Sequence, residues 1–451
     1  MKHQISVLDP QTIVHCDRGT VFIARCDAKA KQTNIHATVF GAGSIDDPIG
    51  AAHLLEHCKL RQPLREGIEI NGGRLAGGTG LVNTTYWGYA PDHCANSLIQ
   101  ATAEATCRAE FSKESFRYEH AEVLAECAYD SLNEVGRLFK LRLKAVVTPD
   151  LTRRYEAYSD IDKLTYSDIV SFFTSTHFSD RLFVAIEGPA DAPKMIDIAQ
   201  EHFVLPRGPE ASIRKFPFHP STIVAPEDNA VATQVSILIE HPDISYNPVD
   251  NFLYSIARQY LASAIYFKTK WDREQSLVRN IESIFVTPDD HMQASGYAFV
   301  AQPQNIQMII EAISDTIRGG FSASQRNTDI MNNTLTRLKD EELKRVPTVD
   351  QLSVRSLVNS AFWANTIYPP DHVKKVLASI TPETVEHFIN RYFLNGRCSL
   401  IYRGYVDSAY PDHKAVAELF QTDTIPRRTA ETDGRLLSKL GDPHHEISPP
   451  K

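Results

Sequence analysis

Two segments far apart in the chain share the same order of features, and this repetition constrains the fold more than any other part of the sequence. They are LTYSDIVSFFTSTHFSDRLFVAIEG at 164–188 and ITPETVEHFINRYFLNGRCSLIYRG at 380–404. Each predicts a threonine-capped helix followed by a β-strand that ends in glycine. Because their offset is almost half of the 451 residues, we expect two copies of one α/β unit. The alternative is that unrelated helix–turn–strand units resemble each other.

A proline-rich stretch lies between the two copies, LPRGPEASIRKFPFHPS at 205–221. We therefore predict an N-terminal domain over residues 1–210 and a homologous C-terminal domain over residues 222–420. The remaining residues, 421–451, are polar and contain several prolines. We expect this tail to be loosely ordered.

Charge and composition exclude several classes of protein. The net charge of −9 leaves no basic surplus for phosphates, which argues against a nucleic-acid binder. No window approaches the ~18 apolar residues of a membrane span, and the first residues lack the apolar run of a signal peptide. The seven cysteines are scattered and show no C-x-x-C spacing. We expect reduced thiols and a cytoplasmic location.

The stretch AAHLLEHC at 51–58 places two histidines and a glutamate on one predicted helix. Strands are predicted around 20–26 and 34–44, and the sequence Asp-Asp-Pro at 46–48 predicts the start of a helix that continues to about residue 63. His53 and His57 lie one helical turn apart, so both imidazoles can reach one ion. Glu56 projects about 60° away from His53, within reach of a water on that ion.

This H-x-x-E-H pattern suits zinc chemistry. Zinc binds two imidazoles and a carboxylate and leaves a fourth position for water, whose pKa falls toward ~7. A neighbouring glutamate can take the proton of that water as it attacks a carbonyl. The alternative is an amphipathic helix with Leu54 and Leu55 facing inward and with solvated histidines and glutamate. The motif alone leaves both interpretations open.

A third ligand has to come from elsewhere in the chain. A long helical pattern from about 115 to 145 offers Glu119, Glu122 and Glu126. Glu119 and Glu126 share one face about 10 Å apart along the helix axis, so only one of them can touch the ion. The other could hydrogen-bond to a ligand. Helix geometry does not choose between them.

Three ordered motifs resemble those of the pitrilysin (insulinase-type) zinc metallopeptidases, the inverzincins. They are GAGSIDDPIGAAHLLEHCKL, then GGRLAGGT with TTY, then EHAEVLAE. The resemblance implies Zn²⁺ as cofactor, with His53, His57 and Glu126 as its ligands. It also implies Glu56 as the catalytic base and Glu119 as a partner of a ligand. The fold expected from it is α+β: two homologous domains, each a mainly antiparallel sheet packed with helices, together forming half of a clamshell.

The same resemblance implies substrate-binding positions, and here the sequence departs from the family. Ala76 stands where the family has asparagine, followed by Gly77 and Thr79 on the same predicted strand. In the second half, Arg273 matches a substrate-binding arginine of the family. Asn280 stands where the paired tyrosine, which helps to stabilise the oxyanion, is expected.

An intact zinc motif beside a broken Arg/Tyr pair is typical of the catalytic subunit of a heterodimer in this family, as in mitochondrial processing peptidase. We therefore expect a zinc metalloendopeptidase that acts on an unstructured peptide or presequence. Its partner would be a homologous subunit without the zinc motif, or otherwise a second copy of this chain. The alternatives are a non-catalytic scaffold in a larger complex and a monomeric hydrolase of a small amide.

Overall fold

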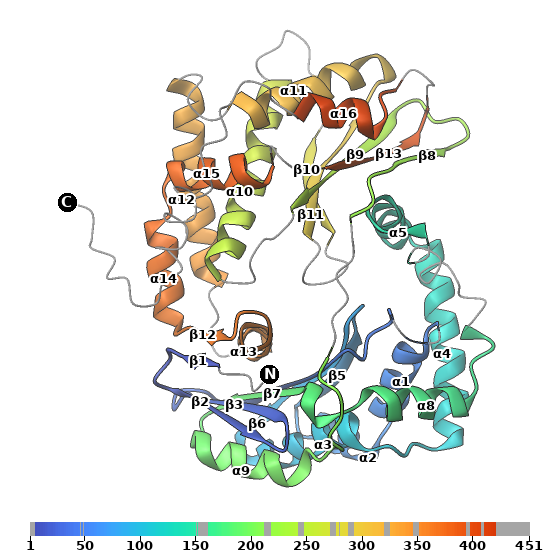
Figure 1. Cartoon of the computed structure of the whole chain (residues 1–451), viewed down its shortest axis with the longest axis vertical. Helices are drawn as coiled ribbons and strands as arrows, with labels where there is room; N and C mark the ends of the chain where they lie inside the picture. Colours follow the sequence, from blue (N-terminus) through green and yellow to red (C-terminus); the bar gives the residue numbers. More distant parts are fainter. Residues whose placement is uncertain are drawn as a thin grey trace. The chain divides into compact units, whose positions relative to one another are not determined.

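The chain folds into helices and mainly antiparallel sheets in the computed structural model shown in Figure 1. The structure describes residues 5–45, 47, 49–149, 151, 161–211, 218–241, 248–270, 277–278, 280–286, 293–319, 325–345, 351–393, 397–406 and 410–420. Arg273 and the predicted tail lie outside these residues. The predicted α+β fold class is confirmed. Within the described residues, no helix is both long enough and apolar enough to cross a membrane.

Contacts divide the chain into two compact units. Unit 1 comprises residues 1–136, 153–214 and 347–370, and unit 2 comprises residues 137–152, 215–346 and 371–451. The junction at 214/215 lies between the predicted domain bounds of 210 and 222. In addition, residues 137–152 group with the second unit and residues 347–370 with the first. Each of these two segments packs against residues that lie far from it in the sequence, and this packing decides the unit to which it belongs.

Unit 1 is built on a six-stranded sheet with the order β2-β3-β7-β4-β6-β5. Its strands are β2 (Thr12–Asp17), β3 (Thr20–Cys26), β4 (Gln32–Phe40), β5 (Arg74–Thr79), β6 (Asn83–Pro91) and β7 (Leu182–Gly188). Its helices are α1 (Ala51–Leu60), α2 (Pro63–Ile70), α3 (Ala95–Cys107), α4 (Lys113–Leu132), α8 (Tyr166–Thr176), α9 (Ala192–His202) and α13 (Gln351–Trp363). Short strands β1 (Ser6–Val7) and β12 (Thr366–Ile367) pair in parallel beside the sheet.

Unit 2 is built on a five-stranded sheet with the order β10-β11-β9-β13-β8. Its strands are β8 (Thr222–Pro226), β9 (Thr233–His241), β10 (Ile281–Val286), β11 (Gln293–Ala301) and β13 (Cys398–Gly404). Its helices are α10 (Pro248–Lys270), α11 (Ile306–Gly319), α12 (Gln325–Arg345), α14 (Pro370–Ser379), α15 (Pro382–Tyr392) and α16 (His413–Phe420). Helix α5 (Glu134–Val146) begins in unit 1 and continues in unit 2.

The two sheets share one topology. In unit 1, β7 lies between a parallel neighbour, β3, and an antiparallel one, β4, which is followed by β6 and β5. In unit 2, β13 lies in the same way between β8 and β9, which is followed by β11 and β10. The helices before β7 and β13 both begin with a capping box, at Thr165 and Thr381. The predicted repeat is therefore a repeat of fold, with β2 as an addition to unit 1.

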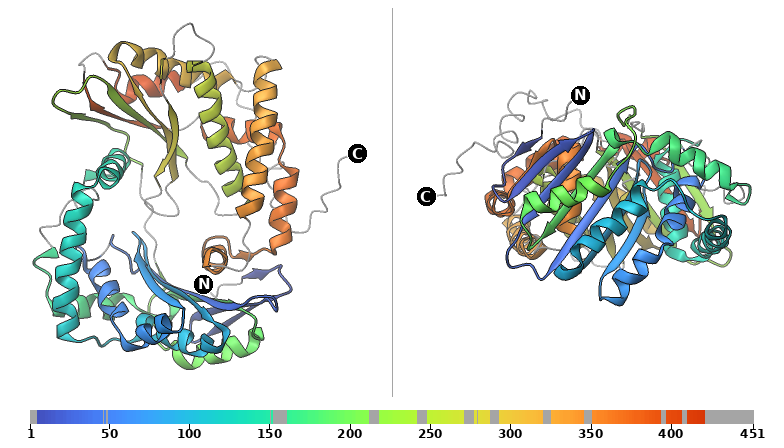
Figure 2. Two further views of the ribbon diagram at one scale, coloured as in Figure 1. Left: turned by 180° about the vertical axis from the view of Figure 1, so that it is seen from behind. Right: turned by 90° about the horizontal axis from the view of Figure 1, so that it is seen from below.

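Both faces of the unit 1 sheet are covered. Helices α1, α3 and α9 contact one face, and α13 contacts β4 and β7 on the other, as Figures 1 and 2 show. On the α13 side, Phe40 stacks on Phe362 with ring centroids 3.4 Å apart, beside the fully buried Val358. A helix from late in the sequence thus completes the core of the first unit.

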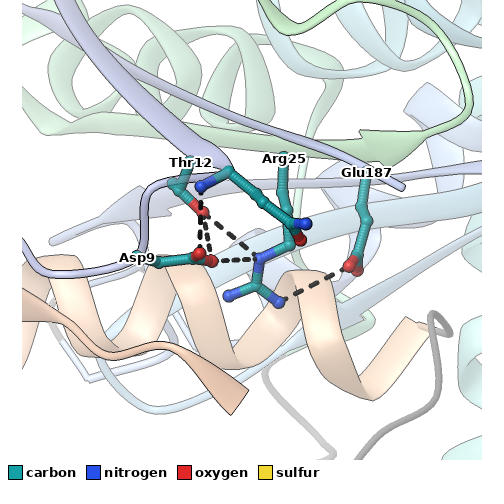
Figure 3. Close-up of polar contacts among 5 residues, drawn as sticks. Asp9, Thr12, Arg25 and Glu187 are labelled. Carbon is teal, nitrogen blue, oxygen red and sulfur yellow. Dashed lines mark hydrogen bonds and ion pairs between the residues drawn. The ribbon is translucent and has the colours of Figure 1, made fainter. Parts of the chain in front are cut away.

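A buried polar network fixes the N-terminal segment to this sheet (Figure 3). The Arg25 guanidinium lies 2.9 Å from an Asp9 carboxylate oxygen and 3.4 Å from one of Glu187. Thr12 donates to the same Asp9 carboxylate at 2.7 Å. All four residues are buried, so the two carboxylates depend on the cation between them.

The predicted helices differ from the structure in three respects. The helix predicted from about 115 to 145 divides at Asn133, whose backbone is extended and whose side chain accepts from the Val135 amide at 3.0 Å. The helix that carries the two histidines ends at Leu60 and does not reach residue 63; a separate helix begins at Pro63. It also begins at Ala51, after Gly50, and not at residue 48.

Candidate metal centre

Helix α1 is held in one orientation by its start and by its buried side. Gly50 precedes it with φ of 87°, and a Cβ there would lie 2.4 Å from the Ile161 side chain, so glycine is required. The Asp47 carboxylate accepts from the Ala52 amide at 2.8 Å and caps the helix. Leu54 and Leu55 are fully buried. Because the leucine side of α1 is packed in the core, the other side of this helix faces α4.

His53 and His57 lie on that side with their ring centroids 4.8 Å apart, and both are partly exposed. Glu126 reaches them from α4. Its Oε2 lies 3.7 Å from His53 Nε2 and 3.4 Å from His57 Nε2. One possible ligand atom from each residue lies within 4.8 Å of the other two. Bonds of ~2.1 Å in a tetrahedral zinc site put ligand atoms about 3.4 Å apart, so this donor set fits one zinc ion.

Glu119 lies behind His57 and not beside the three converging groups. Its Oε2 is 3.2 Å from His57 Nδ1, and its Oε1 accepts from Arg61 Nη1 at 3.2 Å. A carboxylate at Nδ1 favours the tautomer with its proton there, which leaves the Nε2 lone pair for a metal. Glu122, the third glutamate that the sequence offered, is exposed and outside the group.

Glu56 is buried between α1 and β5. Thr79 Oγ1 donates to its Oε2 at 3.3 Å. Burial raises the pKa of Glu56 to about 7, and the Glu126 charge adds to this, whereas His57, Thr79 and Arg65 act against it. A carboxyl group with this pKa exchanges protons near neutral pH, as a general base must.

Gly77 provides the space that the Glu56 carboxyl group occupies. A Cβ on Gly77 would lie 2.5 Å from Glu56 Oε1, closer than side chains pack. Gly77 and Thr79 point to the same face of β5, because strand residues alternate. Ala76 faces the other side. All three are partly exposed, on the edge strand of the sheet.

The predicted site residues of the second half are not part of this cluster as described. Arg273 lies outside the described residues, and Asn280 is an exposed residue of unit 2 that directly precedes β10.

The motifs of the sequence do not indicate the bond between Arg61 and Glu119. The position of Arg61 four residues after His57, one helical turn on, could have indicated the shared side.

Comparisons with known proteins agree with the motifs. No protein-family model matches the chain. An uncharacterized zinc protease of Mycobacterium leprae is 23% identical over 175 residues, which are 36% of this chain and 39% of that protein. The chain thus matches well under half the length of this curated relative.

Two solved structures share the fold. A protease from Helicobacter pylori has a TM-score of 0.69 at 14% identity, over 88% of this chain and all of that one. A chain of Complex III2 from Candida albicans with Inz-5 bound has a TM-score of 0.70 at 12% identity, over 90% of this chain and 98% of that one. The sequence match, the shared fold and the three ordered motifs together confirm the predicted resemblance to the pitrilysin-like family.

Proposed function

We propose that the chain is a zinc-dependent endopeptidase that cleaves an unstructured peptide or presequence. The observation that carries this proposal is the convergence of His53, His57 and Glu126 beside the buried carboxyl of Glu56. A solvated helix face would not need a glutamate buried against a glycine of the neighbouring strand. The similarity to a zinc protease supports the same chemistry.

In this proposal, His53, His57 and Glu126 hold zinc. The ion, when bound, supplies Lewis acidity and makes a water molecule acidic enough to be a nucleophile near neutral pH. Glu56 takes up a proton at its carboxylate and releases it to the leaving amine, a role that its pKa of about 7 supports. Glu119 holds the His57 ring through Nδ1 at 3.2 Å.

The proposed substrate lies along β5 as an added strand. This strand forms the edge of the unit 1 sheet, and edge strands bind extended peptides through their main-chain groups. Ala76 and Gly77 have side chains too small to obstruct a neighbouring strand, and Gly77 adjoins Glu56. An unstructured substrate fits this mode, because a folded one would first have to release a segment.

The proposal includes a partner: a homologous subunit without the zinc motif, which supplies the Arg/Tyr element that Asn280 leaves incomplete here. The fold shared with a chain of Complex III2 supports association with other subunits in general terms. A cytoplasmic location is part of the same proposal, and the seven cysteines, which form no disulfide with one another, support a reducing compartment. Purification of the chain as a fully active homodimer would overturn the heterodimer.

Zinc content and peptide cleavage, measured on the wild-type protein and on Glu56→Gln, test the function. The substrates are unstructured peptide libraries, presented to the protein alone and together with whatever subunit copurifies, with products identified by mass spectrometry. We expect about one zinc per chain in both proteins and cleavage by the wild type alone. His57→Ala should lose the zinc, whereas the exposed His202→Gln in the same unit should keep it. Wild-type protein without zinc, or cleavage unchanged in Glu56→Gln, would overturn the proposal.

A second candidate is a non-catalytic core subunit of a larger complex, and the fold shared with Complex III2 is the observation that favours it. This candidate predicts that the chain takes up no zinc and that Glu56→Gln changes neither assembly nor any activity. The same two measurements therefore separate the two functions.

A further inference from the structure

Arg61 makes contacts that a solvated surface arginine does not need. It lies just beyond the C-terminus of α1, four residues after His57, and donates from Nη1 to Glu119 Oε1 at 3.2 Å. Its guanidinium carbon lies 3.8 Å from the centroid of the Tyr118 ring. Two consecutive residues of α4 thus hold one side chain, one through charge and one through its aromatic face.

The two oxygens of Glu119 are divided between Arg61 and His57. Oε1 accepts from Arg61, and Oε2 lies 3.2 Å from His57 Nδ1. The Glu119 side chain is only 12% exposed, so few orientations are open to it. Both oxygens belong to one planar carboxylate group. A change in the contact with Arg61 therefore rotates this group and moves the oxygen that faces the His57 imidazole.

We propose that Arg61 is a positioning residue of the metal centre, which acts through Glu119 to hold the His57 imidazole with Nε2 directed at the metal. This inference rests on the proposed function. Arg61 is not one of the three candidate ligand residues. Its Nη1 donates to Oε1 of the Glu119 carboxylate, and the stacking on Tyr118 fixes the direction of the guanidinium.

An exposed ion pair contributes little to folding stability as a rule, and the Arg61 side chain is 46% exposed. We therefore expect Arg61→Gln to leave the melting temperature of the metal-free protein unchanged. Its effect should appear in metal affinity, because partners of ligands typically account for 10–100-fold in affinity. Arg61 contacts the partner of a ligand and not the ligand itself. We therefore expect a loss of about tenfold in metal affinity, the lower end of that range.

Zinc affinity, measured by competition with a chromophoric chelator on full-length protein, provides the test. Arg61→Gln should weaken zinc binding about tenfold, and Arg61→Lys, which keeps the charge but not the planar stacking, should recover part of the loss. The matched control is Arg108→Gln, since Arg108 pairs with Glu104 at 4.0 Å on its own helix.

A double variant shows whether Arg61 acts through Glu119. In a Glu119→Gln background, Arg61→Gln should weaken zinc binding no further. An equal loss with and without Glu119, or an Arg61→Gln protein with wild-type affinity, would overturn the inference and leave the proposed function standing. Wild-type protein that binds no zinc at all would overturn both.

Discussion

The same structural position carries candidate metal ligands in unit 1 and apolar core in unit 2. After the antiparallel strand that neighbours β7 or β13, the chain forms a helix, α1 or α10, that contacts an edge strand and a second helix, α4 or α12. In α1 the buried residues include Glu56. In α10 they include Leu253, Ile256 and Ile265, all fully buried. Among the described residues, three converging ligand groups occur in unit 1 and not in unit 2.

The two units thus differ in few side chains on a common scaffold. The sheet topology and the pair of helices are common to both units. The short helix of unit 1 turns one polar side to α4, and Gly77 on its edge strand leaves room for a carboxyl group. On the edge strand of unit 2, Ile281 and Ile284 are buried instead. A few side chains therefore distinguish the candidate metal site of unit 1 from the apolar core at the same position of unit 2.

The largest expected effect concerns zinc and the local stability of the two units. Zinc at a thousandfold its dissociation constant should add about 4 kcal/mol to the opening free energy of amides in α1, α4 and β5, because the ligand binds the folded site. Amides of α10 and α12 should be unaffected. Hydrogen exchange with and without zinc measures both sets in one sample. An equal gain in opening free energy in both units would contradict this contrast, because the two units would then open together.

A somewhat smaller effect should follow from Glu56→Gln in the metal-free protein. Burial raises the Glu56 pKa from 4.5 to about 7 in the folded state. The folded state therefore binds more protons between these values, and stability falls as pH rises through that window. The Glu56→Gln variant has no carboxyl group at this position, so it does not lose this stability as the pH rises. Above pH 7 its free energy of unfolding should exceed that of the wild type by up to about 3 kcal/mol. Urea unfolding from pH 4.5 to 8 measures this.

The control for that titration is Glu122→Gln, which removes an exposed carboxylate from α4. This variant should unfold with nearly the free energy of the wild type, because exposed side chains contribute little to folding stability. A Glu56→Gln difference that stays flat over the same pH range would show that the carboxyl is not buried against β5 in solution.

The smallest effect, about 100-fold in kcat/KM, is expected from Gly77→Ala. The new Cβ would lie 2.5 Å from Glu56 Oε1, and the carboxyl group is the flexible partner that must move. A misplacement of about 1 Å at a catalytic group can cost this much. Zinc content should stay at the wild-type level.

Gly78→Ala is the matched control, because its Cβ would meet only the Thr85 hydroxyl at an ordinary 3.5 Å. Similar losses in both variants would mean that the backbone of β5, and not the space beside Glu56, is what matters.

The sequence predicted the fold class, the repeat and the pairing of α1 with α4, because these follow from local patterns and from spacing on helices. The convergence of His53, His57 and Glu126 agrees with the predicted ligand set, whose role stays a prediction until metal is measured. Other features depend on contacts that spacing does not encode. The space at Gly77 and the Arg61–Glu119 bond each arise from a neighbour that is distant in the sequence. The break at Asn133 involves a local bond from the Val135 amide, which the helical pattern of the sequence does not reveal.

The packing of α13 on unit 1 has a consequence for how the protein is made. During synthesis, Val21, Phe40 and Phe183 leave the ribosome long before Val358 and Phe362, which cover them in the finished fold. Domains generally fold as they emerge, but this sheet face stays open until residues 351–367 have been translated. The nascent chain therefore carries an apolar surface from the synthesis of β7 until that of α13, a surface of the kind that chaperones bind.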